Sequence, residues 1–295
     1  MPGYFDRTMT RRGFVRGTSL AMAGLALRST GLRSADAAGF RVALLSDTHI
    51  PADPQGQYRG FFPVQNLSAV VPAVVSAQPE IAVICGDAAR LTGELGDYEA
   101  LKALLSPLAE RAPIYIGLGN HDNRANFFQV FDQLPAGRQE VSGKHVAVIE
   151  RPGVRLIVLD SLLYVDRVAG LLGKAQRQWL TEFLEKADDR ATALLVHHTL
   201  GDGDGDLLDT DRLFALIRPH RNVKAIFYGH SHVWGITERA GVRLVNLPAV
   251  GYNFRDQDPV GWVEASFTSA GVDLLLHAAA GNRDADGSRH SLRWS

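Results

Sequence analysis

Five short apolar runs in this 295-residue chain are each followed directly by a side chain that can bind a metal ion. The runs cover residues 41–46, 81–86, 114–119, 193–196 and 224–229, and the residues that follow them are Asp47, Asp87, Asn120, His197 and His230. His49 and His232 each stand two residues beyond such a position. Carboxylate, imidazole and amide ligands together suit divalent Zn, Mn, Fe or Co, whereas soft metals prefer thiolates. The sequence therefore predicts a site for divalent metal ions.

The apolar runs themselves are rich in Val, Ile and Leu, as buried β-strands are. In open α/β sheets, ligands bind beyond the carboxyl ends of the strands. We therefore expect residues that are distant in the sequence to meet at one edge of the fold. Gly86, Gly119 and Gly229 each precede a ligand position. A sharp turn at a strand end often needs a positive φ or a close approach of the backbone, which glycine permits.

The rest of the chain alternates helical and strand patterns early and contains β-hairpins later. Helices are predicted over residues 66–77, 97–109, 123–134, 174–187 and 207–217, and hairpin strands over 144–150, 154–159, 235–239, 242–245, 260–267 and 272–277. This order predicts an α/β fold in which two sheets pack face to face with helices outside. The domain is predicted to span residues 38–280, followed by a polar, disordered tail over residues 281–295.

The first 37 residues have a different character. Arg11-Arg12-Gly13-Phe14 precedes a mildly apolar stretch, residues 17–27, and a small-x-small cleavage site, residues 35–37. This is the layout of a secretory signal, and the paired arginines resemble a twin-arginine signal. The alternative is a disordered basic tail. The signal interpretation predicts that the twin-arginine export machinery is a partner and that the protein is exported to the periplasm or the outside of the cell.

Composition excludes several classes of protein. The formal net charge is −1, and it becomes −5 without residues 1–37, which contain six Arg and two acidic residues. A broad basic surface for nucleic acid is therefore not expected. A single cysteine, Cys85, excludes an internal disulfide framework, and its apolar neighbours predict a buried thiol. The sequence contains no uncharged apolar stretch of 18 residues, so no membrane span is expected in the mature form.

The order of the five motifs resembles the calcineurin-like metallophosphoesterase family. The motifs are Asp-x-His at 47–49, Gly-Asp at 86–87, Gly-Asn-His-Asp at 119–122, His-His at 197–198 and Gly-His-x-His at 229–232. The resemblance implies a four-layer αββα sandwich of two mixed sheets with a dinuclear metal site at the carboxyl ends of strands. It implies two divalent ions (Mn, Fe, Zn or Co) that share Asp87 as a bridge. The implied ligands are Asp47, His49, Asp87 and His232 for one ion and Asp87, Asn120, His197 and His230 for the other.

The resemblance also implies roles in catalysis. A water or hydroxide between the two metals would attack phosphorus, as expected of a two-metal site. His121 would contact the phosphate or protonate the leaving oxygen, and Asp122 would orient the His121 ring. Asn120, His121 and Arg90 are the predicted substrate-binding residues. Arg90 is included because its position shortly after Asp87 could place a cation near a phosphate.

The chain departs from the family pattern at two places. The sequence after Asp87 continues Ala-Ala-Arg and offers no further acid, and Thr199 stands where the family often has proline. Both departures concern the substrate pocket. His198 also remains an alternative to His197 as the metal ligand, with His197 preferred because it is the first histidine after the strand.

The function implied is an exported, metal-dependent phosphoesterase. The motif style most resembles the phosphodiesterase branch of the family, whose substrates are small phosphate esters such as cyclic nucleotides and glycerophosphodiesters. A phosphomonoesterase or nucleotidase of the same fold is the close alternative. A non-catalytic periplasmic module that binds a metal or ligand is the alternative from another class. Tyr58 and residues 252–255 could contact substrate or serve only in packing.

Overall fold

The computed structural model describes residues 39–294, so the predicted signal peptide, residues 1–37, lies outside the described residues. The first sheet has six strands, three of which are parallel and lead to predicted ligands. The other three strands are antiparallel and come from the end of the chain. In spatial order the strands are β13 (Arg289–Arg293), β12 (Gly271–Gly281), β11 (Pro259–Thr268), β1 (Phe40–Leu45), β2 (Ile81–Cys85) and β3 (Ile114–Gly117).

The second sheet has seven strands and is also mixed. Its middle strands β6, β7, β8 and β10 are parallel, and the hairpins at either side add antiparallel edges. In spatial order the strands are β4 (Arg138–Val141), β5 (Lys144–Arg151), β6 (Val154–Val158), β7 (Ala191–Leu195), β8 (Val223–Tyr228), β10 (Val242–Asn246) and β9 (Gly235–Arg239).

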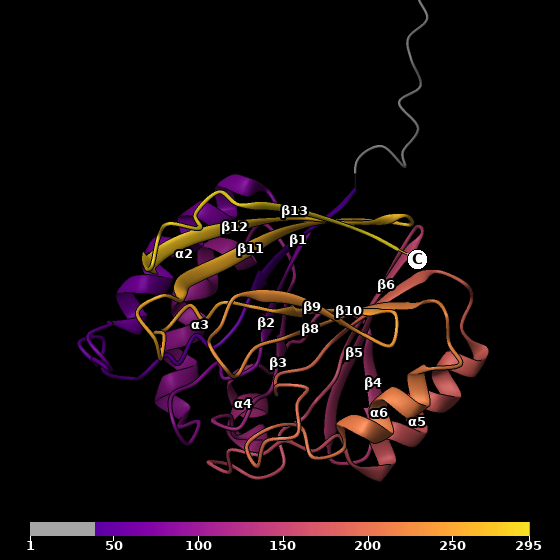
Figure 1. Cartoon of the computed structure of the whole chain (residues 1–295). Helices are drawn as coiled ribbons and strands as arrows, with labels where there is room; N and C mark the ends of the chain where they lie inside the picture. Colours follow the sequence, from indigo (N-terminus) through magenta and orange to yellow (C-terminus); the bar gives the residue numbers. More distant parts are fainter. Residues whose placement is uncertain (1–38, 295) are drawn as a thin grey trace, which may run out of the picture. The chain divides into compact units, whose positions relative to one another are not determined.

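Helices cover the outer face of each sheet, as Figure 1 shows. The helices α2 (Pro63–Ala77), α3 (Leu95–Ala109) and α4 (Arg124–Val130) lie on the first sheet, and α5 (Gly173–Lys186) and α6 (Thr210–Ile217) lie on the second. Successive residues of a strand face opposite sides. Leu44 therefore packs between the sheets against Leu195 and Phe227, while Leu45 packs under the helices. The predicted four-layer αββα sandwich is confirmed.

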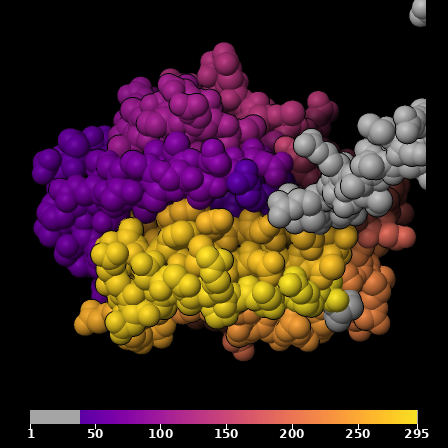
Figure 2. Space-filling model, turned by 90° about the horizontal axis from the view of Figure 1, so that it is seen from above, coloured from indigo at the N-terminus to yellow at the C-terminus, as the bar shows by residue number. Residues whose placement is uncertain are grey.

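The predicted disordered tail is wrong, because β13 pairs with β12 along its length. Leu292 and Trp294 alternate with exposed residues and pack against the core between the sheets. The Trp294 indole also donates a hydrogen bond to the Thr268 carbonyl at 3.3 Å. The yellow C-terminal strands cover much of the face in Figure 2, beside the indigo and purple N-terminal residues. The high polarity of residues 289–294 hid the alternation of exposed and partly buried side chains that is typical of a strand.

The predicted helices and strands are otherwise shifted by a few residues. The helix predicted over 123–134 is the shorter α4, which ends at Val130 because Phe131 leaves the helical conformation. At its start, the Asn123 side chain caps the helix by accepting from Ala125 N and Asn126 N at 3.1 and 3.3 Å. The helix predicted over 207–217 begins at Thr210. Strand β4 was not predicted. Within residues 39–294, no helix has the length and apolar character needed to cross a membrane.

Candidate metal centre

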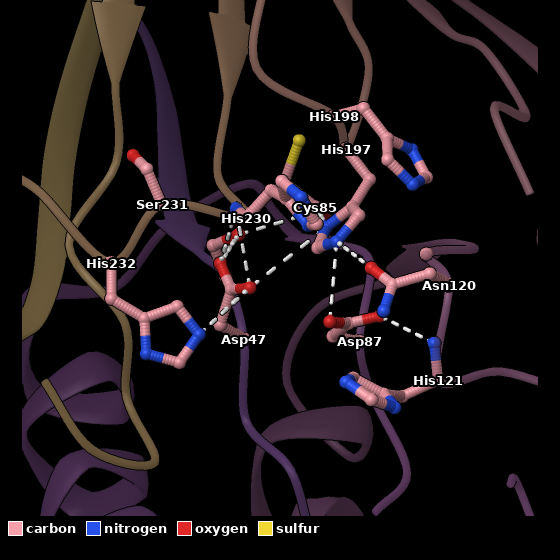
Figure 3. A network of polar contacts seen from close by, with 12 residues as sticks. Asp47, Cys85, Asp87, Asn120, His121, His197, His198, His230, Ser231 and His232 are labelled. Carbon is pink, nitrogen blue, oxygen red and sulfur yellow. Dashed lines mark hydrogen bonds and ion pairs between the residues drawn. The ribbon is translucent and has the colours of Figure 1, made fainter. Parts of the chain in front are cut away.

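The predicted metal ligands lie together where parallel strands of both sheets end. Asp47, Asp87 and Asn120 follow β1, β2 and β3 of the first sheet. His197 and His230 follow β7 and β8 of the second sheet. Figure 3 shows Asp47 between His232 and His197, and Asp87 beside Asn120 and His197. The two sheets therefore supply ligands to one shared site.

One group of side chains surrounds Asp47. The Nε2 atom of His232 lies 3.3 Å from Asp47 Oδ1 and 3.1 Å from the Nε2 atom of His49. All three side chains are buried, and their ligand atoms lie within 4.8 Å of one another. This geometry fits the first predicted ligand set, because one cation can contact all three groups.

Asp87 lies between this group and the histidines of the second sheet. Its Oδ2 atom is 3.8 Å from His49 Nε2 and 3.2 Å from His197 Nε2. The Asn120 Oδ1 atom lies 3.3 Å from the same His197 nitrogen. Asp87 thus has the position that a ligand shared by two metal ions requires.

His197, His198 and His230 form a further cluster, in which the ligand atoms lie within 4.8 Å of one another. The His230 ring is centred 5.1 Å from the His197 ring and 4.8 Å from the His198 ring. His198 Nδ1 lies 2.7 Å from the Ser161 hydroxyl, and its buried Nε2 has no hydrogen-bond partner among residues 39–294. Since it is His197 that approaches Asp87 and Asn120, the geometry favours His197 as the ligand, with His198 as its close neighbour.

Hydrogen bonds outside the ligand set orient two of the imidazole rings. His197 donates from Nδ1 to the Cys85 carbonyl at 2.9 Å, and His232 donates from Nδ1 to the Tyr252 carbonyl at 2.6 Å. A carbonyl only accepts, so each ring carries a proton on Nδ1 and directs Nε2 toward the carboxylates. Such outer hydrogen bonds are typical of metal-binding histidines.

The backbone is strained at the ligands. Ten non-glycine residues of the described chain have a positive φ, and five of them are predicted ligands. These five are Asp47, His49, Asp87, His230 and His232, with φ between 46° and 69°. Such a conformation costs on the order of 1–3 kcal/mol per residue and clusters at functional sites. The hydrogen bond from Asp47 N to the Gly86 carbonyl at 3.1 Å helps to hold it.

Two of the predicted glycines are required by close approach rather than by φ. A Cβ on Gly119 would collide with the Asp87 carboxylate, and a Cβ on Gly229 would collide with Ser46 and the Asp47 carboxylate. The glycines therefore leave room for the two acids at the centre of the site.

The electrostatics of the site favour a cation. Burial raises the pKa of Asp47, but His232 and His197 more than offset burial and hold that pKa well below its usual range. His197 likewise outweighs burial at Asp87, whose pKa is also lowered. Burial lowers the pKa of His197, yet Asp87 and Asp47 raise it to about 9. A proton on His197 balances only part of the charge of the two carboxylates, whereas a divalent ion bound at Nε2 would replace that proton and balance both charges.

Metal binding requires imidazoles that carry no competing proton, and two of the predicted ligands meet this requirement. Burial lowers the pKa of His49 to about 3 and the pKa of His230 to about 4. Both are therefore free of a competing proton near neutral pH. With two ionised carboxylates, neutral imidazoles and an amide oxygen, the residues present fit a site for divalent metal ions.

His121 lies at the open edge of the site. Its backbone N–H donates to Asp87 Oδ1 at 2.9 Å, and its ring donates from Nδ1 to the Leu91 carbonyl at 2.8 Å. Asp166 Oδ1 lies 3.7 Å from the same ring nitrogen. The ring therefore has a fixed orientation that leaves Nε2 for a substrate. Arg90 lines a pocket together with His49 and His121, so the predicted substrate residues are brought to the site.

The predicted role of Asp122 in orienting the His121 ring is wrong. Its buried carboxylate accepts hydrogen bonds from the backbone N–H groups of Gly119, Ala88 and Ala89 and from the Tyr98 hydroxyl. Burial and the nearby Asp87 raise the pKa of Asp122 to about 6. Asp122 thus joins the loops after β2 and β3, and the Leu91 carbonyl orients His121 instead.

We expect Tyr98→Phe to lower the free energy of unfolding by about 1–3 kcal/mol, because it removes one of four hydrogen bonds to the buried Asp122 carboxylate and leaves the backbone donor of Asn123 without its partner. The Tyr98 hydroxyl donates to Asp122 at 3.0 Å and accepts from Asn123 N at 2.8 Å. Urea denaturation measures the change. The control is Tyr164→Phe, at a side chain that is 69% exposed. Equal stability of the two variants would show that Asp122 does not depend on this hydroxyl.

Several known proteins resemble this chain in sequence or in fold. A family model described as calcineurin-like phosphoesterase matches residues 40–234. A probable cyclic nucleotide phosphodiesterase of Synechococcus is 28% identical over 77% of this chain and 87% of its own. The glycerophosphodiester phosphodiesterase GpdQ of Enterobacter lignolyticus is 29% identical over 70% of this chain and 76% of its own. A dimetal phosphatase from Danio rerio has the same fold, with a TM-score of 0.65 at 13% identity over 88% of this chain and all of its own.

Proposed function

The chain belongs to the calcineurin-like phosphoesterase family, and on this basis we propose that it is a metal-dependent phosphodiesterase that hydrolyses small phosphodiesters. The position of Asp87, between His49 and His197 and bonded to the backbone of His121, carries the proposal. The names of the relatives, a cyclic nucleotide phosphodiesterase and a glycerophosphodiester phosphodiesterase, support the diester class.

The proposal includes two divalent metal ions, drawn from Mn, Fe, Zn and Co. One would be held by Asp47, His49 and His232, the other by Asn120, His197 and His230, and both by Asp87. When bound, such ions lower the pKa of water toward neutrality and neutralise charge on a phosphoryl group. Ligands of these types accept several metals, so availability and geometry decide which ion is bound.

His121 contributes the proton chemistry in this proposal. Its Nδ1–H is occupied by the Leu91 carbonyl, which leaves Nε2 to bind a phosphate oxygen or to protonate the leaving oxygen. An imidazole suits this task because its ordinary pKa is close to neutral pH. The ring is partly exposed, with 19% of its side chain accessible, so a substrate can reach it.

The test compares bis(p-nitrophenyl) phosphate with p-nitrophenyl phosphate, each with Mn²⁺ or Zn²⁺ added. We expect faster hydrolysis of the diester. Faster hydrolysis of the monoester would support a phosphomonoesterase of the same fold. Metal binding without hydrolysis of either compound would support a non-catalytic binding module.

We also propose that residues 1–37 direct export through the twin-arginine machinery, on the strength of Arg11 and Arg12 followed by Phe14. The double variant Arg11→Lys, Arg12→Lys is expected to stay inside the cell, because the paired arginines are the part of the signal that is recognised. Immunoblots of cell fractions measure this, with Arg7→Lys as the control. Normal export of the double variant would contradict the proposal.

A further inference from the structure

A pocket of about 160 Å³ opens beside the metal centre, and much of its wall is aromatic. It is bordered by His49 and His121 at the metal centre, and Tyr58, Tyr252 and Phe254 line it. None of these three aromatic residues belongs to the metal-binding motifs. The pocket therefore adds a second recognition element next to the place where a phosphate would be bound.

The aromatic rings form a continuous set that begins at the metal ligands. Tyr252 is buried, and its ring centre lies 4.7 Å from that of His49 and 4.6 Å from that of His232. Tyr58 packs on Tyr252 at 4.6 Å with an interplanar angle of 62°, and Phe254 stacks on His232 at 4.4 Å. Tyr58 is 42% exposed and Phe254 is 44% exposed. The outer rings therefore have area available for a ligand.

The loops that carry these rings are tied to each other. Arg59, next to Tyr58, donates from Nε to the Asn253 carbonyl at 3.2 Å and from Nη2 to the Phe254 carbonyl at 3.0 Å. Its guanidinium also lies 5.5 Å from the centre of the Phe254 ring. Tyr58 and Phe61 exchange two backbone hydrogen bonds of 2.9 Å. The wall is thus held in place before a ligand arrives, which reduces the entropy cost of binding.

Arg90 brings a positive charge to the same pocket. Its backbone N–H donates to the Ile50 carbonyl at 3.1 Å, which fixes the loop after β2. Among the salt bridges of residues 39–294, none involves the Arg90 guanidinium. Its positive charge nevertheless acts to lower the pKa of Asp97 and of Tyr252, against the stronger effect of burial. A partly buried cation beside aromatic rings suits a ligand that combines an anionic group with a planar ring.

We propose that this pocket binds the base of a nucleoside phosphodiester, with Tyr58 as a specificity-determining residue. This proposal rests on the proposed phosphodiesterase activity. A base stacks on an aromatic side chain through its flat face, and this holds for every base whatever hydrogen-bond donors and acceptors it carries. A glycerol group has no such face and gains little from Tyr58 or Phe254. The pocket therefore favours cyclic nucleotides over glycerophosphodiesters at the same metal centre.

The test measures kcat and KM of the Mn²⁺-loaded enzyme for 3′,5′-cyclic AMP and for glycerophosphoethanolamine. We expect Tyr58→Ala to raise KM for cyclic AMP by roughly 5- to 100-fold, the range for loss of one stacked base, and to leave KM for the glycerol diester within about twofold. Tyr58→Phe keeps the ring and is expected to behave like the wild type. Tyr164→Ala removes another exposed tyrosine, one that does not line the pocket, and serves as the control.

An equal change of KM for both substrates, or no change for either, would overturn the specificity role of Tyr58. Binding of cyclic AMP measured by calorimetry separates this failure from failure of the proposed function. If the wild type hydrolyses neither diester but binds cyclic AMP, and Tyr58→Ala weakens that binding, the phosphodiesterase proposal fails and the base pocket stands. If cyclic AMP is neither bound nor hydrolysed, the base pocket is wrong.

Discussion

Asp87→Ala is expected to lose metal and to reduce kcat/KM by roughly 1000-fold or more. Asp87 lies 3.8 Å from His49 Nε2 and 3.2 Å from His197 Nε2, so its removal affects both ligand groups. Each bound metal contributes several kcal/mol to stabilising charge in a transition state, and about 4 kcal/mol corresponds to a 1000-fold change in rate. The Asp87 carboxylate also accepts a hydrogen bond from the backbone N–H of His121 at 2.9 Å, and the variant would lose this hydrogen bond as well.

The measurement combines metal content after dialysis with hydrolysis of bis(p-nitrophenyl) phosphate. Asp202→Ala is the control, because Asp202 is an exposed acid that stands outside the metal-binding clusters formed by residues 39–294. Circular dichroism shows whether both variants remain folded. Full activity of Asp87→Ala, or binding of two metals per chain, would show that Asp87 is not the shared ligand.

The clustering of the candidate metal ligands was predictable because five of them directly follow a recognisable strand pattern. A buried parallel strand is a short run of apolar residues, and its end is marked by the first polar residue. The strands β1, β2, β7 and β8 all have this form, and the site lies where their carboxyl ends meet. Local patterns therefore indicated a site built from residues that are distant in the sequence.

Contacts made by loops and by the backbone were not predictable in this way. His121 is oriented by the Leu91 carbonyl, and every residue has a carbonyl, so nothing in the sequence distinguishes it. Asp122 stands next to His121 in the chain, yet its carboxylate turns away toward Tyr98 and three backbone N–H groups. Adjacent residues in a turn can point in opposite directions, and spacing alone does not show which.

The same limit applies to the end of the chain. Residues 289–293 contain three charged or ionisable side chains and only one aliphatic residue, Leu292, so composition indicated disorder. The strand is held by backbone pairing with β12 and by Leu292 and Trp294 against the core. Pairing energy of this kind depends on a partner strand, which the local sequence does not reveal.

His121→Ala is expected to keep both metals and to lower kcat by 10²- to 10⁴-fold, the usual range for removal of a general acid. The backbone N–H that donates to Asp87 is retained in alanine, so the ligand geometry does not depend on the side chain. The ring itself contacts the Leu91 carbonyl and Asp166, which lie outside the proposed ligand set. The His121→Ala variant should therefore lose proton transfer to the leaving oxygen while it keeps metal binding.

Metal content and single-turnover rates distinguish the two effects, with His220→Ala as a control at a histidine outside the centre. The rate loss should be smaller for a diester with a p-nitrophenolate leaving group, because that group leaves without a proton, and larger for one with an alkoxide leaving group. An equal loss with both would mean that His121 binds the phosphate instead of protonating the leaving oxygen. Loss of metal from His121→Ala would instead place the ring in the ligand set, contrary to its hydrogen bond with Leu91.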